Sequence, residues 1–514
     1  MTKKHASLRA GYLMATAVAA LAVYTPAQAD PTPECNDGPG AQSTECGTNS
    51  TATADGATAV GAGALATGAD AVAVGSDDAG TNPATASAAS TVAVGGESDA
   101  TTPGATALGW QAQATGAMGT AVGHQTTASG DQSFAGGEDA VASGLQAVAI
   151  GNVAMASGDG GTALGANTQA TSDETVAVGS NAQAVAAGAV GVGGEAIANG
   201  VASVAIGRDS RADGVDAVAI GGDDQGNGAQ AIGNSTVAVG GESDATTPGS
   251  MGTAVGHQTT ASGDQSFAGG EDAVASGSSA VAVGFGSTAS GGDSIAIGGN
   301  RDSATAGTQA ATATGDSTTA VGGQSNANGP GATAYGWRAN AAAERATAVG
   351  HLATASGVRS VSVGEDADAT GFRSIAVGDV AQSSGASSVA IGGANPISGQ
   401  STSANGNVSV AIGAGAQTTA GAIASTAIGP SALAGGVGSI AVGGRTQATA
   451  DRAIAIGGEA TPEGAMAPRN VTASAVGAVA LGAGAMADGE TSIATGNLAS
   501  ATGTDAIAIG DQTV

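Results

Sequence analysis

Short apolar runs recur along the chain, and a glycine closes nearly every one. From Gly123 to Gly221 in steps of seven, thirteen of fifteen positions are glycine. The seven-residue segments are of two kinds. One kind ends in branched aliphatic residues before its glycine, as in Val204–Gly207, and the other ends in small or polar residues, as in Ala212–Gly214. The repeating unit is therefore fourteen residues long. Self-similarity at a fixed period is typical of repeat architectures.

The same pattern favours strands over helices. Glycine every seven residues costs a helix about 1 kcal/mol each time relative to alanine, and the large a and d residues of a coiled coil are absent. Val and Ile prefer strands, in which side chains alternate between two faces. We expect two short strands and two glycine turns to form one coil, with Val204 and Ile206 inside and Ala205 outside. The sequence thus predicts an all-β roll of parallel coils, stabilised by neighbour stacking.

The alanines of the expected outer face favour assembly. Small side chains allow close approach of backbones, so a second copy would hide this face from water. We therefore expect a homo-oligomer. A lone roll is the alternative, because an alanine surface is not large enough to require burial.

Composition and charge exclude several classes of protein. Glycine contributes 90 of 514 residues and aromatic residues only 2%, which leaves little of the side-chain volume that conventional enzyme cores bury. The net charge of −29 opposes binding to nucleic acid and to anionic membranes. We find no catalytic constellation, and we expect no enzymatic activity and no cofactor.

The first residues resemble an export signal. Lys3, Lys4 and Arg9 are followed by an apolar run, and Ala27-Gln28-Ala29 matches a cleavage site. We expect a signal peptide at residues 1–29, cleaved between Ala29 and Asp30, and an exported mature chain. A retained membrane anchor is the alternative. No later stretch is long and apolar enough to span a bilayer as a helix.

Export would place the two cysteines of the chain in an oxidising compartment. Cys35 and Cys46 lie in a leader at residues 30–52 that is rich in Pro, Gly and Asp. In an oxidising compartment we expect them to form a disulfide. A metal site is the weaker alternative, because the segment has no CxxC motif and no histidine.

Residues 53–514 resemble a known family. Ser203–Gly221 reads SVAIGRDSRADGVDAVAIG, and Ser360–Gly378 repeats the same phase of Val, Ile and Gly. This unit resembles the head repeat of YadA-like trimeric autotransporter adhesins. The resemblance implies a left-handed parallel β-roll of fourteen-residue coils that forms a homotrimer. It also implies display at the surface or outer membrane of a Gram-negative cell, and adhesion to host extracellular matrix, cells or other surfaces.

The chain departs from that family at its end. It stops at Ile507–Val514 within a repeat, without a heptad stalk or aromatic C-terminal strands. Either the chain is a truncated product or fragment, or its anchor is supplied otherwise. We expect that this segment does not itself insert into a membrane.

Duplications and insertions interrupt the repeat. Met118–Gly144 is identical to Met251–Gly277, as a linear solenoid that gains and loses units would allow. Irregular segments rich in small polar residues are expected to be surface loops, where recognition usually occurs. They lie at residues 77–90, 223–228, 300–319, 393–407 and 461–470.

A few residues offer candidate chemistry. His124, His257 and His351 each follow Val-Gly at the same repeat position. We expect them on exposed turns and expect no metal site; the alternative is that equivalent histidines of a trimer approach one another and hold a metal or halide. Trp110 and Trp337 are candidate contact residues or caps of the core. The acidic groups Asp77-Asp78, Asp223-Asp224 and Glu365-Asp366 with Asp368 offer oxygen ligands for Ca²⁺. They lack the G-G-x-G-x-D-x-U-x period of calcium-binding rolls, so calcium is the weaker interpretation.

Two other functions fit a secreted solenoid. An ice- or mineral-binding protein needs a regular rank of threonines on a flat face, and threonine is frequent here but not present in every coil. A polysaccharide-processing enzyme needs carboxylates over an aromatic groove, and the aromatic residues are missing.

Overall fold

The computed structural model describes residues 35–76, 82–222, 225–246, 251–300, 310–463 and 467–514. Within these ranges the protein is all-β, and no helix that could cross a membrane is found there. The expected signal peptide, with cleavage between Ala29 and Asp30, lies outside the described residues. The chain divides into two compact units, residues 1–181 and 182–514, which share one architecture.

One coil illustrates the repeat in both units. A three-residue strand, Val204–Ile206, is followed by a turn at Gly207–Ser210. A two-residue strand, Arg211–Ala212, follows, and a second turn at Gly214–Ala217 returns the chain to the start of the next coil. The next coil pairs in parallel with this one, Val204 with Val218 and Ile206 with Ile220. The coils are thus a parallel β-solenoid with two sheets, as the glycine period predicts.

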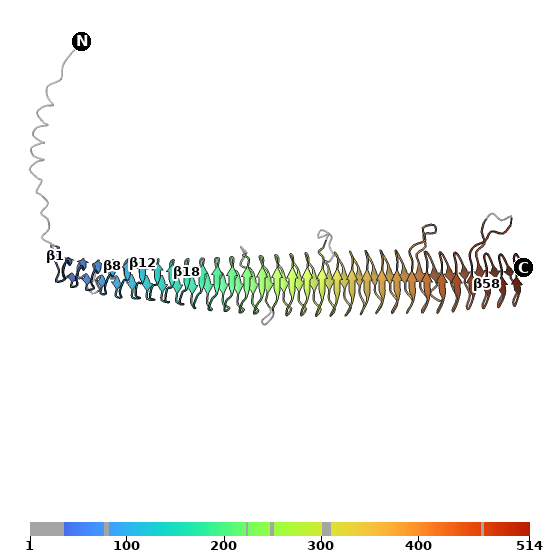
Figure 1. Cartoon of the computed structure of the whole chain (residues 1–514), viewed down its shortest axis with the longest axis horizontal. Coiled ribbons are helices and arrows are strands. Elements are labelled where there is room, and N and C mark those ends of the chain that lie inside the picture. The colour runs from blue at the N-terminus through green and yellow to red at the C-terminus, as the bar shows by residue number, and fades with distance from the viewer. Residues whose placement is uncertain (1–34, 77–81, 223–224, 247–250, 301–309, 464–466) are drawn as a thin grey trace, which may run out of the picture. The chain divides into compact units, whose positions relative to one another are not determined.

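The three-residue strands carry even numbers and form the even sheet of each unit (Figure 1). The two-residue strands from β3 onward form the odd sheet, whereas β1 (Asn36–Asp37) joins the even sheet. In the first unit, the even strands are β2 (Thr44–Cys46), β4 (Thr58–Val60), β6 (Val72–Val74), β8 (Val92–Val94), β10 (Thr106–Leu108), β12 (Thr120–Val122), β14 (Phe134–Gly136), β16 (Val148–Ile150), β18 (Thr162–Leu164) and β20 (Val176–Val178). Its odd strands are β3 (Thr51–Ala52), β5 (Leu65–Ala66), β7 (Thr85–Ala86), β9 (Asp99–Ala100), β11 (Gln113–Ala114), β13 (Thr127–Ala128), β15 (Val141–Ala142), β17 (Met155–Ala156) and β19 (Gln169–Ala170).

The second unit continues both series. Its even strands are β22 (Val190–Val192), β24 (Val204–Ile206), β26 (Val218–Ile220), β28 (Val237–Val239), β30 (Thr253–Val255), β32 (Phe267–Gly269), β34 (Val281–Val283), β36 (Ile295–Ile297), β38 (Thr319–Val321), β40 (Thr333–Tyr335), β42 (Thr347–Val349), β44 (Val361–Val363), β46 (Ile375–Val377), β48 (Val389–Ile391), β50 (Val410–Ile412), β52 (Thr426–Ile428), β54 (Ile440–Val442), β56 (Ile454–Ile456), β58 (Val479–Leu481), β60 (Ile493–Thr495) and β62 (Ile507–Ile509). Its odd strands are β21 (Gln183–Ala184), β23 (Ile197–Ala198), β25 (Arg211–Ala212), β27 (Gln230–Ala231), β29 (Asp244–Ala245), β31 (Thr260–Ala261), β33 (Val274–Ala275), β35 (Thr288–Ala289), β37 (Thr312–Ala313), β39 (Asn326–Ala327), β41 (Asn340–Ala341), β43 (Thr354–Ala355), β45 (Asp368–Ala369), β47 (Gln382–Ser383), β49 (Ser403–Ala404), β51 (Gln417–Thr418), β53 (Leu433–Ala434), β55 (Gln447–Ala448), β57 (Thr472–Ala473), β59 (Met486–Ala487) and β61 (Ser500–Ala501).

The insertions leave the strand register intact. Arg211 pairs with Gln230 across the segment at residues 223–228, and Thr288 pairs with Thr312 across residues 300–311. The expected loops at residues 77–90, 300–319 and 393–407 are wrong in part, because each contains an odd strand of the solenoid: β7, β37 and β49. The extra residues are therefore accommodated between strands, while each coil still stacks on the next.

Glycine at the turns is set by the close approach of neighbouring coils. Gly207 has φ +122°, and a Cβ there would lie 2.6 Å from the carbonyl carbon of Gly221. At the second turn, a Cβ on Gly214 would lie 2.0 Å from the carbonyl oxygen of Gly233. Both contacts are with backbone of the next coil, which explains why glycine recurs every seven residues.

The interior holds alanine, and the expectation that Val and Ile fill it is wrong. Ala205 and Ala212 are fully buried, whereas Val204 is half-buried and Ile206 is 38% exposed. The odd strand explains this orientation, because Arg211 beside Ala212 is far too polar to face inward. Once the odd sheet turns alanine inward, the facing even strand has room only for another small side chain. The expected alanine outer face is consequently a face of branched aliphatic residues.

Small hydroxyl residues complete the interior. The largest fully buried side chains of the described residues are Val471 and a set of threonines. Thr175 donates a hydrogen bond to the carbonyl of Ser172 over 2.6 Å, and Ser210 donates one to Gly207 over 2.8 Å. These bonds satisfy buried hydroxyls that would otherwise destabilise a thin core.

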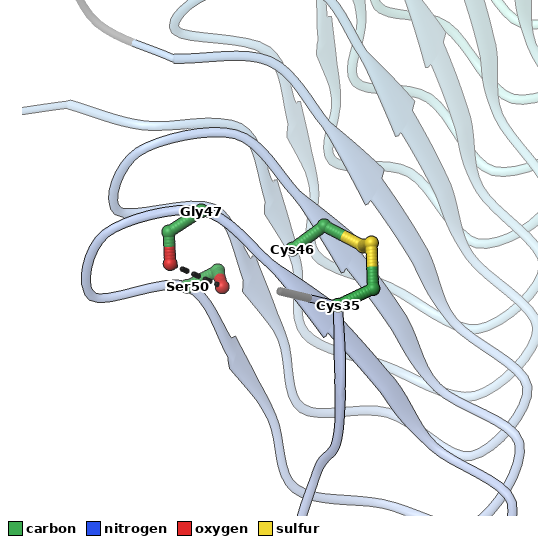
Figure 2. Close-up of a disulfide and its surroundings, with 4 residues drawn as sticks. All are labelled: Cys35, Cys46, Gly47 and Ser50. Atoms are coloured by element: carbon green, nitrogen blue, oxygen red, sulfur yellow. Dashed lines mark hydrogen bonds between the residues drawn. A yellow bond between two sulfur atoms is a disulfide. The ribbon is translucent and has the colours of Figure 1, made fainter. Parts of the chain in front are cut away.

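The first described residues are joined to the stack covalently. Cys35 and Cys46 form a disulfide, and Cys46 ends β2 (Figure 2). β2 pairs in parallel with β4, and antiparallel with β1 (Asn36–Asp37). Beside the disulfide, the Ser50 hydroxyl donates to the carbonyl of Gly47. The disulfide therefore ties the first described residue to the first even strand.

Candidate functional site

The even sheet of each unit presents an apolar outer surface, here called the even face. It consists of the first and third residues of the even strands. From β4 to β62 no such residue is charged, and most are Val, Ile, Leu or Thr. Many are substantially exposed, for example Ile150 at 43% and Ile220 at 37%. In a chain of net charge −29, an uncharged face of this extent is typical of a protein interface.

The odd sheet presents a different surface, here called the odd face. Its outward residues are the first residues of the odd strands, and most are Gln, Thr, Asp, Asn or Ser. Ile197 and Met155 are among the apolar exceptions. Each unit therefore has one apolar side and one predominantly polar side.

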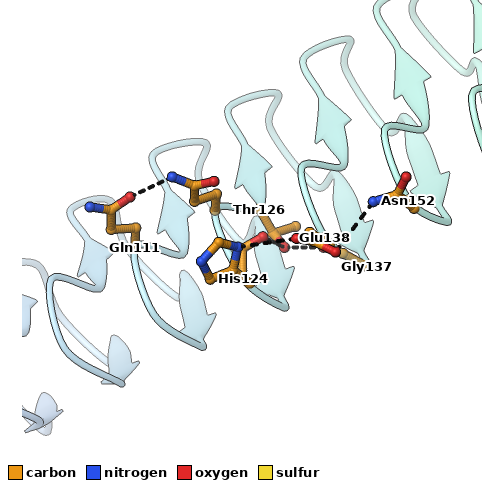
Figure 3. A network of polar contacts seen from close by, with 7 residues as sticks. Gln111, His124, Thr126, Gly137, Glu138 and Asn152 are labelled. Carbon is orange, nitrogen blue, oxygen red and sulfur yellow. Dashed lines mark hydrogen bonds and ion pairs between the residues drawn. The ribbon is translucent and has the colours of Figure 1, made fainter.

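The turns after the even strands carry ladders of side chains. In the first unit, Trp110 stacks on His124 with ring centroids 4.8 Å apart. His124 Nδ1 lies 3.8 Å from Glu138 Oε1, and the Asn152 amide donates to the other Glu138 oxygen (Figure 3). Gln125 donates to Gln111 over 2.9 Å in the neighbouring column. These contacts join equivalent positions of successive coils.

The second unit repeats the ladder at Trp337 and His351, whereas the tryptophan is missing before His257. Trp337 stacks on His351 at 4.8 Å, and His351 Nδ1 lies 3.4 Å from Glu365 Oε1. Before His257 the corresponding position is Gly241, so no stack forms there.

The structure does not gather the histidines into one site. His124 and His351 have side chains 45% and 44% exposed on turns of separate coils. Among the described residues no group of three or more His, Cys, Asp or Glu is placed to hold a metal. Of the calcium candidates, Asp77-Asp78 and Asp223-Asp224 lie outside the described residues.

The two tryptophans occupy similar positions with different exposure. Trp110 is 43% exposed. The Trp337 indole nitrogen is buried without a hydrogen-bond partner, and the Arg338 guanidinium lies 5.3 Å from its ring centroid. Trp110 therefore has the larger surface available for a contact.

Three equivalent aspartates on the odd face have altered acidity. Burial raises the pKa of Asp99, Asp244 and Asp368 above the ordinary value of 3.8. A hydrogen bond from Thr85 partly offsets this increase in the pKa of Asp99. Repulsion from Glu242 adds to the increase in the pKa of Asp244, and repulsion from Asp366 adds to that of Asp368.

A shallow polar groove of about 450 Å³ lies along the odd face of the second unit. One wall contains Thr312, Asn326, Asn340 and Thr354, the first residues of four successive odd strands. Asn326 donates to Asn340 over 3.2 Å, so the amides form a ladder along it. Such a wall offers repeated donors and acceptors to a ligand.

Comparison with known proteins identifies the repeat. The family model described as the YadA head domain repeat (2 copies) matches residues 47–64, 52–77, 86–112, 114–140, 137–154, 142–168, 156–182, 184–210, 198–223, 248–273, 275–300, 313–339, 341–367, 369–394, 420–446, 434–460, 473–499 and 487–513. The chain belongs to the YadA head repeat family. The family resemblance inferred from its sequence is thereby confirmed.

A search of solved structures adds one comparison. The YadA head repeats of this chain align with the crystal structure of the collagen-binding domain of the Yersinia adhesin YadA at 19% identity. The alignment covers 45% of this chain and 81% of that one, with a TM-score of 0.14. No curated protein matches the chain.

Reasoning from the sequence missed the even face. The missed signal is the polar residue that precedes alanine in the odd strands, such as Arg211 before Ala212 or Gln230 before Ala231. A polar residue before alanine requires the alanine of the odd strand to point inward. The even strand that faces it across the thin interior must then also point its alanine inward.

Proposed function

We propose that this chain is the exported, non-catalytic head of a homotrimeric surface adhesin. Membership of the YadA head repeat family supports an adhesin-type module. The observation that carries the proposal is the division of each unit into an uncharged apolar face and a polar face. The first face suits assembly and the second suits contact with ligands and water.

Assembly uses the even face. Leaving a continuous ladder of Val and Ile in water is unfavourable by about 25 cal/mol for each Å² of apolar surface. A partner that covers it must be apolar along its length and must repeat at the same coil spacing. Another copy of the same face meets both requirements, and threefold symmetry closes the assembly without leaving a free apolar face.

Ligand contact uses the odd face and the inserted segments. In the trimer the odd face remains exposed, with Trp110, the polar groove and the loops such as residues 393–400 available. Loops and polar grooves on a rigid scaffold are the usual places for recognition. The ligand class is host matrix, a cell surface or another solid surface, and no cofactor takes part.

The expected signal peptide supports an exported location. Residues 1–29 act as a signal peptide that is cleaved before Asp30, and the mature head is displayed at a Gram-negative cell surface or released. The Cys35–Cys46 disulfide is compatible with an oxidising compartment.

Sedimentation equilibrium of residues 30–514 tests the assembly. The mature chain is expected to sediment as a trimer. A charge on the even face, I206E, is expected to disrupt the trimer. The same change on the odd face, I197E, is the matched control and is expected to leave it intact. A monomeric wild type, or equal effects of the two variants, would contradict this use of the even face.

Binding of the mature trimer to immobilised collagen, fibronectin, laminin and whole host cells tests adhesion. Saturable binding to at least one of them is expected, together with loss of that binding when the trimer is dissociated by I206E. No binding to any matrix protein, cell or abiotic surface would contradict the adhesin function.

An ice- or mineral-binding role is the alternative function. Along the odd face, threonine occurs irregularly among other residues, as in Thr85, Asp99, Gln113, Thr127 and Val141. This sequence gives no continuous rank of hydroxyls, so no observation favours the alternative. Thermal hysteresis in a solution of the mature chain would reverse that preference.

A further inference from the structure

Two copies of the even face can align in more than one register. Most even strands carry a branched aliphatic residue at both outward positions. Sliding one copy along another by a whole coil therefore brings Val or Ile against Val or Ile again. A repeat of this kind specifies register weakly unless some coils differ from the rest.

Two even strands carry a phenylalanine and a glycine at their outward positions, and a third, β40 (Thr333–Tyr335), carries a tyrosine that is 58% exposed. β14 reads Phe134-Ala135-Gly136, and β32 reads Phe267-Ala268-Gly269. Both phenylalanines point outward, with 36% and 39% of their surface exposed. In each strand a large aromatic residue and a glycine replace the usual pair of branched residues.

Each phenylalanine ring lies over its own glycine. A Cβ on Gly136 would lie 3.1 Å from Cε1 of Phe134, and a Cβ on Gly269 would lie 3.0 Å from Cε1 of Phe267. The ring therefore occupies the space that the side chain of the third residue fills in other strands. The phenylalanine and the glycine form one unit, here called a Phe–Gly rung.

The flanking strands keep the ordinary shape. Phe134 pairs with Thr120 on one side and Val148 on the other, and Gly136 pairs with Val122 and Ile150. The Phe–Gly rung is thus a single aromatic level between aliphatic levels. In β32 the same arrangement recurs, with Val281 and Val283 on the following strand.

We infer that the Phe–Gly rungs set the register between copies of this chain; the inference rests on the proposed trimer. In register, threefold symmetry places three equivalent rings at one level, where offset or edge-to-face contacts between aromatic rings are favourable. A shift of one coil separates the rings and places each against Thr or Val of a partner. It also sets each Phe–Gly rung against a partner level shaped by two separate side chains, so the packing at that level is no longer matched.

Disulfide trapping measures register directly. Each chain receives one added cysteine on the even face, either V281C in β34 or I295C in β36, one coil further on. In one mixture, tagged and untagged V281C chains are refolded together. In a second mixture, untagged V281C chains are refolded with tagged I295C chains. The cross-linked products of both mixtures are quantified. Bonds between two 281 positions report an aligned trimer, and bonds between 281 and 295 report a slip of one coil.

The test compares three backgrounds. In the wild type, 281–281 bonds are expected to exceed 281–295 bonds at least tenfold. Replacing both rungs by the ordinary pattern, F134V/G136V/F267V/G269V, is expected to reduce that ratio at least threefold while sedimentation still shows a trimer. The control F372V removes a phenylalanine that is 46% exposed on a turn outside the even face, and no change is expected. If the fourfold variant aggregates, F267V/G269V alone is used, with a smaller reduction expected.

The outcomes separate the two proposals. An unchanged ratio in trimers of the rung variant overturns the register inference and leaves the trimer in place. An equal reduction in F372V also overturns it. A wild type that does not form trimers overturns both proposals.

Discussion

The carboxylate of Asp131 accepts a hydrogen bond from the backbone N–H of Ala117, the equivalent residue one coil earlier, over 2.9 Å. The same bond recurs between Asp159 and Leu145, and asparagine supplies the acceptor where Asn234 meets Val215. All lie in the turns that follow odd strands. Some of the chain's aspartates therefore link one coil to the next through these hydrogen bonds.

Removing one such acceptor should loosen a single turn. D131A is expected to destabilise the turn at Ala117 by about 1 kcal/mol, the typical contribution of one hydrogen bond. Hydrogen exchange followed by mass spectrometry should show faster exchange for peptides that contain Ala117. D131N keeps the acceptor oxygen, as Asn234 does, and should restore most of the protection. Equal exchange in D131A and wild type would show that the bond contributes nothing.

The turn glycines differ in how well they tolerate substitution by a residue that carries a side chain. G207A places a methyl group against the backbone of Gly221, at a position with φ +122°, so local unfolding around β24 and β26 is expected. Gly160 has φ +67° with nothing within 4 Å of a Cβ, and Gln146 and Glu174 occupy the equivalent left-handed positions. G160Q should therefore lower stability by no more than about 1–2 kcal/mol. Hydrogen exchange of the coils that contain Gly207 and Gly160 measures the effect of each substitution. Comparable losses of protection in G207A and G160Q would contradict the expected difference between the two glycines.

The sequence predicts the coil well because its strongest constraint recurs along the whole solenoid. A backbone contact between successive coils requires glycine at positions such as Gly207 and Gly214. The seven-residue glycine period therefore predicts the positions of both turns in each coil. The strand pattern does not by itself tell which side faces inward. Val204-Ala205-Ile206 alternates equally well in either orientation.

Packing across the interior decides that orientation. The polar neighbour Arg211 excludes one arrangement of the odd strand, and the distance between the two sheets then excludes Val and Ile from the even strand. The side-chain ladders were also beyond prediction, since the stack of Trp110 on His124 joins residues fourteen positions apart whose separation depends on coil stacking.

The aspartates of the odd face predict a pH dependence. The pKa of Asp244 is raised in the folded protein, so its contribution to stability is greatest below its ordinary pKa of 3.8. That contribution declines as the pH rises through the folded-state pKa, because burial and Glu242 then oppose the charged form. D244N should melt at a higher temperature than the wild type at pH 7 and at a similar temperature at pH 3.

Melting curves at these two pH values check the sign. D368N removes an equivalent carboxyl, whose pKa is raised by burial and by Asp366, and should behave in the same way. A lower melting temperature for both variants at pH 7 would show that these carboxylates stabilise the fold when charged.

The central claim, that alanine fills the interior while branched residues face outward, is tested most directly at Ala205. Native-state hydrogen exchange of A205V should show lost protection in β22, β24 and β26, because two added methyl groups overpack a tight core at a cost of about 1–3 kcal/mol. The neighbouring change I206V, on the even face, should leave that protection nearly unchanged. Normal protection in A205V together with lost protection in I206V would place the aliphatic ladder inside and contradict the account.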